Sequence, residues 1–214
     1  MIEDLHETIK KIKQSLRLSM NGIVSAHQRK SGLDYKINFG VEIPRIKSIA
    51  AEYKPCKELS EALWQENIRE SKLLAIFLLP EKDYSTVAEK WIAETTFTEI
   101  ADHLSRTILC KIPTAKSSAL RWMNEKRGLY RYCGYLTFTH ITRQGVELNN
   151  EEENRFFTLL TTLFEEEENN ILCRSAFTSL CNYINDSNEK ATRFFSFTGE
   201  ENKLSKLLKE FLYN

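Results

Sequence analysis

The most constraining feature of the sequence is the stretch from Tyr53 to Leu79, which predicts two helices meeting at a tight corner. Pro55 cannot lie inside a helix, so the first helix is expected to begin just after it. Apolar residues then recur at helical spacing in both halves: Leu59, Ala62 and Leu63, followed by Leu73, Leu74, Phe77 and Leu78. Trp64 completes the first stripe, and the second stripe is too apolar to face water. Such a pair needs further helix pairs to cover it, which is typical of a helical array.

The rest of the chain predicts more helices with short joints. Pro44 suits the first turn of one helix, and Asn21–Gly22 ends another. Only 7 glycines and 4 prolines are available for turns in 214 residues, which disfavours a many-stranded sheet. The predicted helices cover residues 2–18, a short stretch ending at 30, 44–53, the pair within 53–79, 83–94, 96–109, 114–125, 129–142, 151–167, 169–185 and a last helix from 199 or 200, with a weaker pattern over 188–198.

These helices predict an all-α fold. Two-helix units follow one another at a spacing compatible with HEAT-type repeats, so we expect a curved α-solenoid of antiparallel helix pairs. A chain of 214 residues can form one such stack, and we expect one domain over residues 1–214.

The composition also gives expectations for the cellular location of the protein and for its cofactors. No apolar run approaches the about 20 residues of a membrane span, and residues 1–10 are too charged for a signal peptide. We therefore expect a soluble, cytoplasmic monomer with no membrane partner. The five cysteines are an odd number without a Cys-x-x-Cys pair, so free buried thiols are expected. The four histidines show no metal spacing, and we expect neither a metal nor a small-molecule cofactor.

The formal net charge of zero conceals a sorting of charge along the chain. Residues 1–146 carry +6 and residues 147–214 carry −6. Between His103 and Val146, Glu125 is the one acidic residue among eight basic residues: Arg106, Lys111, Lys116, Arg121, Lys126, Arg127, Arg131 and Arg143. With Trp122, Tyr130 and Tyr132 interleaved, this segment is a candidate phosphate-binding strip. The alternative is a solvated basic face that pairs with the acidic C-terminal part, which the neutral total favours.

The tryptophans and the longest acidic run have simpler interpretations. Trp64 and Trp91 fit apolar stripes and are expected in the core. Trp122 lies in the basic segment and is expected at a surface. The run Glu165–Glu168 is expected to be a solvated helix end rather than a metal site.

Two phrases of the sequence resemble the AlkD-like DNA alkylation repair glycosylases. They are NFGVEIPRIKSIA at residues 38–50 and LWQENIRESKLLAI at residues 63–76. The family has a glycine–hydrophobic–x–hydrophobic–proline lead into a helix, and then leucine–tryptophan, arginine–glutamate and lysine–leucine–leucine–alanine in a helix pair. The resemblance implies a HEAT-like superhelix that binds duplex DNA in a concave basic face. It also implies hydrolysis of the N-glycosidic bond of cationic N3- or N7-alkylated purines.

The family's tryptophan-x-x-x-aspartate element falls on residues 98–102. The resemblance therefore assigns Asp102 as the catalytic carboxylate, which would stabilise the developing sugar cation or position the attacking water. Thr98 stands in place of the tryptophan, and Phe97 is a possible aromatic substitute. A later helix of the family matches residues 174–178, where Thr178 replaces a second tryptophan.

The family's site arginine best matches Arg131, with Tyr132 beside it as a possible aromatic contact to a cationic nucleotide. Arg131 would then anchor a neighbouring phosphate. The residues expected to contact DNA are Arg106, Lys111, Lys116, Arg121, Trp122, Lys126 and Arg127.

Each assignment has an alternative. Asp102 and Arg106 are four residues apart and can form a surface ion pair contributing about 0.3–0.5 kcal/mol. Arg131 can serve as a structural partner of a carboxylate. The sorted charge and Asp102 favour a repair glycosylase, whereas the two replaced tryptophans favour a catalytically inactive HEAT-like scaffold that binds DNA or a protein partner.

Overall fold

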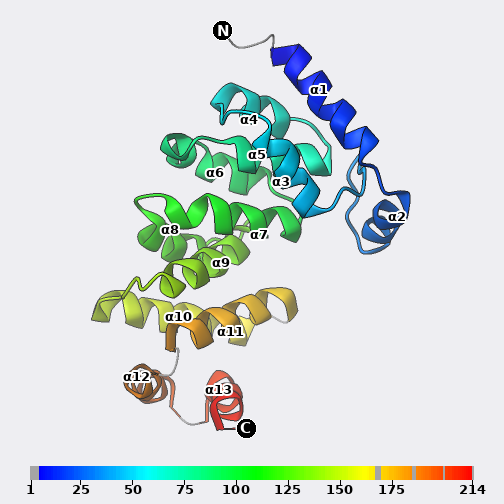
Figure 1. The fold of residues 1–214 in the computed structure, drawn as a ribbon. Coiled ribbons are helices and arrows are strands. Elements are labelled where there is room, and N and C mark those ends of the chain that lie inside the picture. The colour runs from blue at the N-terminus through cyan, green and yellow to red at the C-terminus, as the bar shows by residue number, and fades with distance from the viewer. Residues whose placement is uncertain (1–4, 167–169, 185–186, 200, 214) are drawn as a thin grey trace. The chain divides into compact units, whose positions relative to one another are not determined.

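The computed structural model describes residues 5–166, 170–184, 187–199 and 201–213 (Figure 1). Within these ranges the regular elements are helices, and the one β-bridge joins Ile37 and Ile68. The predicted all-α fold of the α-solenoid class is confirmed, since helices adjacent in the chain pack against one another. The chain divides into two compact units, Met1–Ala88 and Glu89–Asn214. The single domain expected over residues 1–214 stays a prediction.

The first unit begins with five helices and a short 3-10 turn. They are α1 (Leu5–Leu18), α2 (Gly22–Lys30), α3 (Ile43–Ala51), α4 (Lys57–Trp64), α5 (Arg69–Leu78) and η1 (Glu81–Asp83). Pro44 lies in the first turn of α3 as predicted, because its missing N–H would have no intrahelical acceptor there. The pair predicted within residues 53–79 is α4 and α5, and Trp64 is fully buried in the core.

The two phrases that resemble the glycosylase family contact each other through a buried ion pair. Arg69 and Glu70 open α5, and their charged groups lie 3.0 Å apart with almost no exposure. Glu70 accepts the backbone N–H groups of Phe39 at 3.1 Å and Val41 at 3.2 Å. Arg69 Nη1 donates to the Val41 carbonyl at 2.9 Å. Because these hydrogen bonds compensate the buried charges, the pair fixes the loop before α3 onto α5.

Helix α6 (Tyr84–Glu94) contains the boundary between the units. The second unit continues with α7 (Thr98–Thr107), η2 (Leu109–Lys111), α8 (Ala115–Trp122), α9 (Tyr130–Arg143), α10 (Asn150–Glu166), α11 (Asn170–Ile184), α12 (Asn188–Thr198) and α13 (Lys203–Tyr213). The predicted helices between residues 83 and 185 correspond to α6–α11, with ends shifted by a few residues. The predicted boundaries at 167, 169 and 185 lie outside the described residues.

The region after α11 differs from the prediction at one boundary. Residues 188–198, with the weaker pattern, form α12, and Ser187 Oγ caps it by accepting the N–H of Lys190 at 3.3 Å. Gly199 ends α12 with φ +77°, a conformation that does not continue a helix. The prediction that the last helix begins at Gly199 is therefore wrong, and α13 begins at Lys203. Residue 200, the other predicted start, lies outside the described residues.

The core of the second unit is aromatic. Phe138 of α9 stacks on Phe156 of α10 with ring centroids 4.2 Å apart, and Tyr183 of α11 meets Phe156 edge-on at 5.6 Å. Gly134 allows α9 to approach α8, because a Cβ there would lie only 2.7 Å from the backbone nitrogen of Met123. This close contact and the ring cluster fix the position of α9, whose first turn carries Arg131 and Tyr132.

The described part of the chain bears on the expectations for membrane spans, metal sites and cysteines. Every helix in it is too short or too polar to cross a lipid bilayer. It holds no cluster of three or more His, Cys, Asp or Glu side chains arranged for a metal ion. Cys110 and Cys133 are buried thiols as expected, whereas Cys56, Cys173 and Cys181 are only partly buried.

Candidate functional site

A cleft of about 540 Å³ in the second unit is lined by four of the site residues singled out from the sequence, Thr98, Lys126, Arg131 and Tyr132. It is lined by the starts of α7, α9 and α11, the turn before α9 and the end of α10: Thr98, Lys126, Gly128, Leu129, Arg131, Tyr132, Glu166, Ile171 and Leu172. Thr98, Arg131 and Tyr132 come from two different predicted helices. Packing of α9 against both α7 and α11 brings them into one cleft.

The first turn of α9 is held from several sides. Gly128, with φ +48°, turns the chain just before the helix. The Tyr130 hydroxyl donates to the Glu89 carbonyl at 3.1 Å, and Cys133 is fully buried. Arg131 and Tyr132 are therefore presented to the cleft by a rigid helix start rather than by a loose loop.

Arg131 shares a carboxylate with Lys126. Glu166 Oε2, on the last residue of α10, lies 2.9 Å from Lys126 Nζ and 3.6 Å from Arg131 Nη2. The side chain of Arg131 is only 12% exposed, and its buried Nε has no hydrogen-bond partner among the residues that the structure describes. The Lys126 hydrogen bond, with help from both cations, lowers the pKa of Glu166. The cleft thus contains a cation pair that holds an anion.

Asp102 lies next to this cleft through Tyr132. The Tyr132 hydroxyl donates to Asp102 Oδ1 at 3.2 Å. Arg106 directs Nη2 to His103 Nδ1 at 3.0 Å, and in the described residues it forms no ion pair with Asp102. The alternative interpretation of Asp102, a surface ion pair with Arg106, is therefore not realised among the described residues.

The protonation of Asp102 reflects opposing effects. Partial desolvation raises the pKa of Asp102 above its ordinary value of 3.8, although part of the side chain is exposed. The hydrogen bond from Tyr132 and the charge of Arg106 both oppose that rise. Burial and the neighbouring Asp102 charge raise the pKa of the Tyr132 phenol, so this hydroxyl stays a hydrogen-bond donor over the physiological range.

The positions of the family's tryptophans are occupied by small polar residues. Thr98, the first residue of α7, lines the cleft. Phe97, immediately before it, is partly exposed and is not among the residues that line the cleft. Thr178 is exposed on α11 and does not line the cleft either. The cleft is therefore polar at the position where the resemblance implies an aromatic wall.

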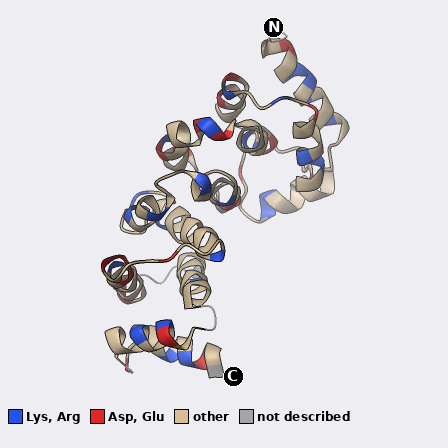
Figure 2. Ribbon diagram, turned by 60° about the vertical axis from the view of Figure 1, so that its left-hand side comes forward, with Lys and Arg blue, Asp and Glu red and all other residues tan. Residues whose placement is uncertain are grey.

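Most of the basic segment is engaged with carboxylates. Four predicted DNA contacts form ion pairs in the described residues: Lys116 with Glu152, Arg121 with Glu89, Lys126 with Glu166 and Arg127 with Glu125. Arg106 and Lys111 are exposed. Figure 2 shows both signs of charge along the helices. Because Glu152 and Glu166 belong to the acidic C-terminal part, the alternative of a basic face paired with that part is partly realised. The DNA contacts themselves stay predictions.

The structure contradicts the predicted surface position of Trp122. It was expected at a surface, but it is 1% exposed and its Nε1 donates to Glu89 Oε1 at 2.9 Å. The reason is the orientation of α8, which packs against α9 and buries Ala115, Ser118, Ala119, Leu120 and Trp122. Arg121, one residue earlier, is exposed on the other side. A buried ring cannot stack on DNA, so Trp122 belongs to the core with Trp64 and Trp91.

Glu166 is the residue that sequence reasoning missed. The sequence predicts a solvated helix end at this position, whereas Glu166 pairs with two cations located 35 and more residues earlier in the chain. Ile171 and Leu172, which add apolar lining to the cleft, were also not predicted as site residues. The excess of basic residues in one segment and of acidic residues in another was the available signal, but it does not identify which residues meet.

The fold and the cleft define an α-helical repeat protein with a nearly buried arginine and an adjacent carboxylate–phenol pair. The sequence model of the DNA alkylation repair enzyme family matches residues 12–197, and the chain belongs to that family. A solved structure described as "a new family of proteins related to the HEAT-like repeat DNA glycosylases with affinity for branched DNA structures" aligns with a TM-score of 0.72. It is 15% identical, and the alignment covers 95% of this chain and 93% of that chain. At this identity the likeness concerns the fold alone. None of the curated proteins matches the chain.

Proposed function

We propose that this protein binds DNA at the cleft of its second unit and hydrolyses the N-glycosidic bond of cationic N3- or N7-alkylated purines. One observation carries the proposal: Thr98, Arg131 and Tyr132 line one cleft, and Asp102 is hydrogen-bonded to Tyr132. These are the positions that the family resemblance assigns to the site. Membership of the DNA alkylation repair enzyme family supports DNA as the substrate.

The chemistry needs few groups. An alkylated purine already carries a positive charge, so the electron pair of the glycosidic bond moves onto the base and the base leaves neutral. The Asp102 carboxylate then stabilises the positive charge that develops on the deoxyribose, or holds the water that attacks C1′. The proton lost by that water goes to the carboxylate or to solvent. Every group in this sequence of events is a side chain, a water molecule or the substrate.

Arg131 and Lys126 supply the contact to a neighbouring phosphate. Both cations now hold Glu166, so a phosphate that enters the cleft replaces one anion by another. This exchange leaves the nearly buried guanidinium of Arg131 with a partner throughout. The half-buried ring of Tyr132 adds an aromatic face, which attracts a cationic nucleotide.

The test is release of 7-methylguanine and 3-methyladenine from methylated duplex DNA under single-turnover conditions. Asp102→Asn removes the charge and keeps the size, so excision should fall by about 100-fold or more, with DNA affinity and folding little changed. Glu99→Gln is the matched control, since it removes one carboxylate from the same helix and should retain excision. Failure of the unaltered protein to release either base, or full activity of Asp102→Asn, would reject the proposed reaction.

A second candidate is DNA binding without excision. The observation that favours it is Thr98 in the cleft, together with the exposed Thr178 outside it, at the positions of the two family tryptophans. The solved structural relative is described by its affinity for branched DNA. Under this candidate the protein binds a four-way junction at least as tightly as an intact duplex, and methylated DNA incubated with it releases no base. Both properties can be measured on the same preparation.

A further inference from the structure

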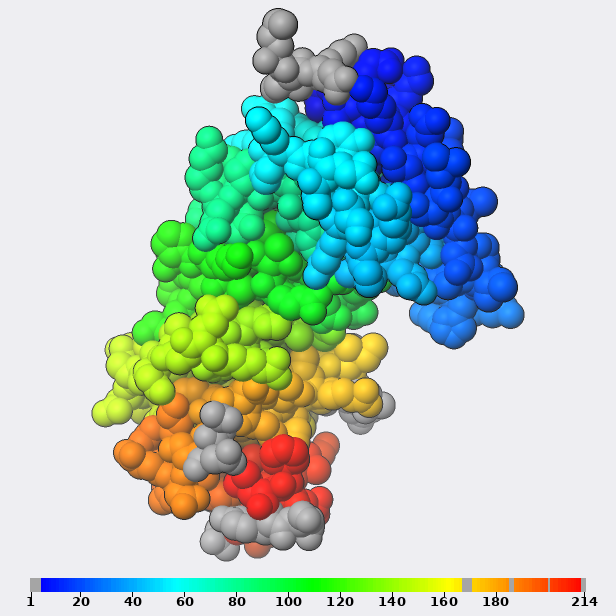
Figure 3. Space-filling view, viewed as in Figure 1, coloured from blue at the N-terminus to red at the C-terminus, as the bar shows by residue number. Residues whose placement is uncertain are grey.

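The first unit has a groove of its own where α3 and α5 end. This α3–α5 groove has a volume of about 440 Å³ and is lined by Lys47, Ala50, Ala51, Tyr53, Pro55, Phe77 and Leu78. The turn after α3 is held against α5, because the N–H of Cys56 donates to the Leu78 carbonyl at 2.9 Å. Figure 3 shows the light-blue and cyan segment around residue 50 on the near surface of the first unit. The groove is therefore a surface feature with a fixed wall.

The floor of the α3–α5 groove is apolar. Ala50 and Leu78 are buried, and the rings of Tyr53 and Phe77 are partly exposed. A surface of this kind binds apolar side chains, because burying them there removes apolar area from water. The lining offers one ammonium group, from Lys47, and one phenol, which are few polar groups for fixing a polar small molecule.

Lysines flank this apolar floor. Residues 47–57 contain one acidic residue, Glu52, and three basic residues: Lys47, Lys54 and Lys57. Lys47 Nζ lies over the Phe77 ring, 5.6 Å from its centroid, which places a positive charge at the rim of the groove. In the described part of the chain Lys57 pairs with Asp83 at 3.7 Å, whereas Lys47 and Lys54 form no ion pair. Two ammonium groups are thus available to an anionic partner.

The size and chemistry of the groove favour a short peptide over other partners. The groove admits a few side chains, whereas a stable interface with a folded protein buries roughly 800 Å² on each partner. Nucleic acid bases stack on open ring faces, but Lys47 already covers one face of the Phe77 ring. A peptide can instead insert one apolar side chain as an anchor and place its flanking carboxylates beside the lysines.

We propose that the α3–α5 groove binds an acidic peptide segment of a partner protein, with one aromatic or large aliphatic side chain of that segment seated in the groove. Lys47 and Lys54 bind carboxylates beside this anchor. Charge complementarity selects acidic over basic segments, and the anchor supplies most of the affinity. The lining residues of this groove are all different from those of the cleft in the second unit. Peptide binding is therefore a function separate from the proposed excision.

The test uses the full chain and a fluorescein-labelled peptide in which a run of aspartates precedes one phenylalanine, with anisotropy as the readout. Ala51→Trp fills the groove from an exposed position, so the core needs no change. It should weaken peptide binding by about tenfold or more, the scale of a lost anchor contact. Ala26→Trp, at an exposed alanine of α2 outside the groove lining, is the matched control. A peptide with serine in place of phenylalanine should bind the unaltered protein weakly.

The lysines are tested by charge reversal. Lys47→Glu with Lys54→Glu should weaken binding of the acidic peptide and flatten its dependence on salt, because the attraction between exposed charges is screened by ions. Lys30→Glu with Lys36→Glu makes the same change of charge at exposed positions outside the groove lining and should have a much smaller effect. Equal effects of the two double variants would overturn the role of Lys47 and Lys54.

The outcomes separate this proposal from the proposed reaction. Selective loss of peptide binding in Ala51→Trp supports the groove, whether or not the protein releases alkylated bases. Failure of the unaltered protein to bind the acidic peptide, or equal affinity of Ala51→Trp and Ala26→Trp, overturns it. If Ala51→Trp instead lowers the affinity for a single-stranded oligothymidine and leaves peptide affinity unchanged, the groove is a nucleic-acid site and the proposal is overturned as well.

Discussion

The phenol of Tyr132 donates a hydrogen bond of 3.2 Å to Asp102 Oδ1, joining α9 to α7 across 30 residues of sequence. Tyr132 was assigned only a possible aromatic role, whereas the structure gives it a direct contact with the candidate catalytic carboxylate. The bond stabilises the ionised form of Asp102 against the desolvation that raises its pKa. It therefore bears on the pH range in which this carboxylate can act.

Tyr132→Phe removes that hydrogen bond, so the pKa of Asp102 should rise further. Since excision needs the ionised carboxylate, the acid limb of the pH–rate profile should move to higher pH, by up to about one unit for a bond of about 1 kcal/mol. Single-turnover excision across pH measures the shift. Tyr130→Phe, whose hydroxyl contacts a backbone carbonyl instead, should leave the limb in place. A limb that moves to lower pH would contradict the role of Tyr132.

Glu166→Gln frees Lys126 and Arg131 from their shared carboxylate. Duplex affinity should rise, and the log–log salt slope should steepen by about 1–2, because two cations become available to phosphates. Anisotropy titrations at several salt concentrations measure both quantities. Glu165→Gln, the exposed neighbour, is the control for net charge. Equal effects of the two variants would show that only the overall charge matters.

Arg121→Glu combined with Arg127→Glu tests the prediction that residues 103–146 supply most of the DNA contact. Duplex binding should weaken and its salt dependence should flatten, because each arginine would otherwise release counterions on binding phosphate. Arg155→Glu with Lys203→Glu changes the charge equally outside the segment. Unchanged affinity and slope for the Arg121/Arg127 variant would favour the scaffold interpretation.

Thr98→Trp restores an aromatic side chain at the cleft position where the family resemblance implies one. Excision, or retention of damaged DNA, should increase because a ring face attracts the cationic base. The comparison uses methylated and unmethylated duplex of the same sequence. Thr178→Trp, on the exposed part of α11 outside the cleft lining, should have the smaller effect. An equal gain on both DNAs would argue against recognition of the alkylated base.

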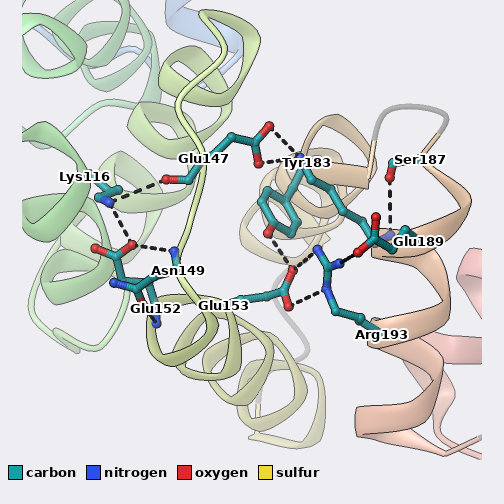
Figure 4. A network of polar contacts seen from close by, with 10 residues as sticks. Lys116, Glu147, Asn149, Glu152, Glu153, Tyr183, Ser187, Glu189 and Arg193 are labelled. Atoms are coloured by element: carbon teal, nitrogen blue, oxygen red, sulfur yellow. Dashed lines mark hydrogen bonds and ion pairs between the residues drawn. The ribbon is translucent and has the colours of Figure 1, made fainter.

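Glu153→Gln should destabilise the C-terminal helices, where Glu153 joins α10 to α11 and α12 (Figure 4). The buried carboxylate accepts from Tyr183 at 2.6 Å and from Arg193 at 2.8 and 2.9 Å. Burial raises its pKa, but these hydrogen bonds outweigh burial and hold the pKa below the ordinary 4.5. The free energy of unfolding should fall by about 1.5–3 kcal/mol at neutral pH.

The sign of the pH dependence follows from that lowered pKa. The stability contributed by Glu153 is present above its unfolded pKa of 4.5 and is lost as the pH falls through the lower folded value. Denaturant unfolding of the variant and the unaltered protein should therefore converge in acid. Glu151→Gln, which changes an exposed residue two positions before Glu153 on α10, should reduce the free energy of unfolding little at any pH. A difference that persists undiminished in acid would contradict this account.

The helices were predictable because their signals are local. Pro44 in the first turn of α3 and the apolar stripes of α4 and α5 depend on neighbours within one or two turns, and both predictions are confirmed. The family phrases were also readable without coordinates, and the family is confirmed. The last helix start failed because the conformation of Gly199, a positive φ, is not specified by the glycine alone.

By itself, then, the sequence determined the all-helical fold, the helix order and the family. Only the tertiary structure decided that Trp122 is buried, that Glu166 pairs with Lys126 and Arg131, and that Tyr132 meets Asp102. The physical reason is the separation along the chain of the residues that interact. Helical periodicity is fixed by contacts between residues three or four apart, whereas burial and ion pairing depend on which faces of distant helices meet, and many pairings satisfy the same stripes equally well.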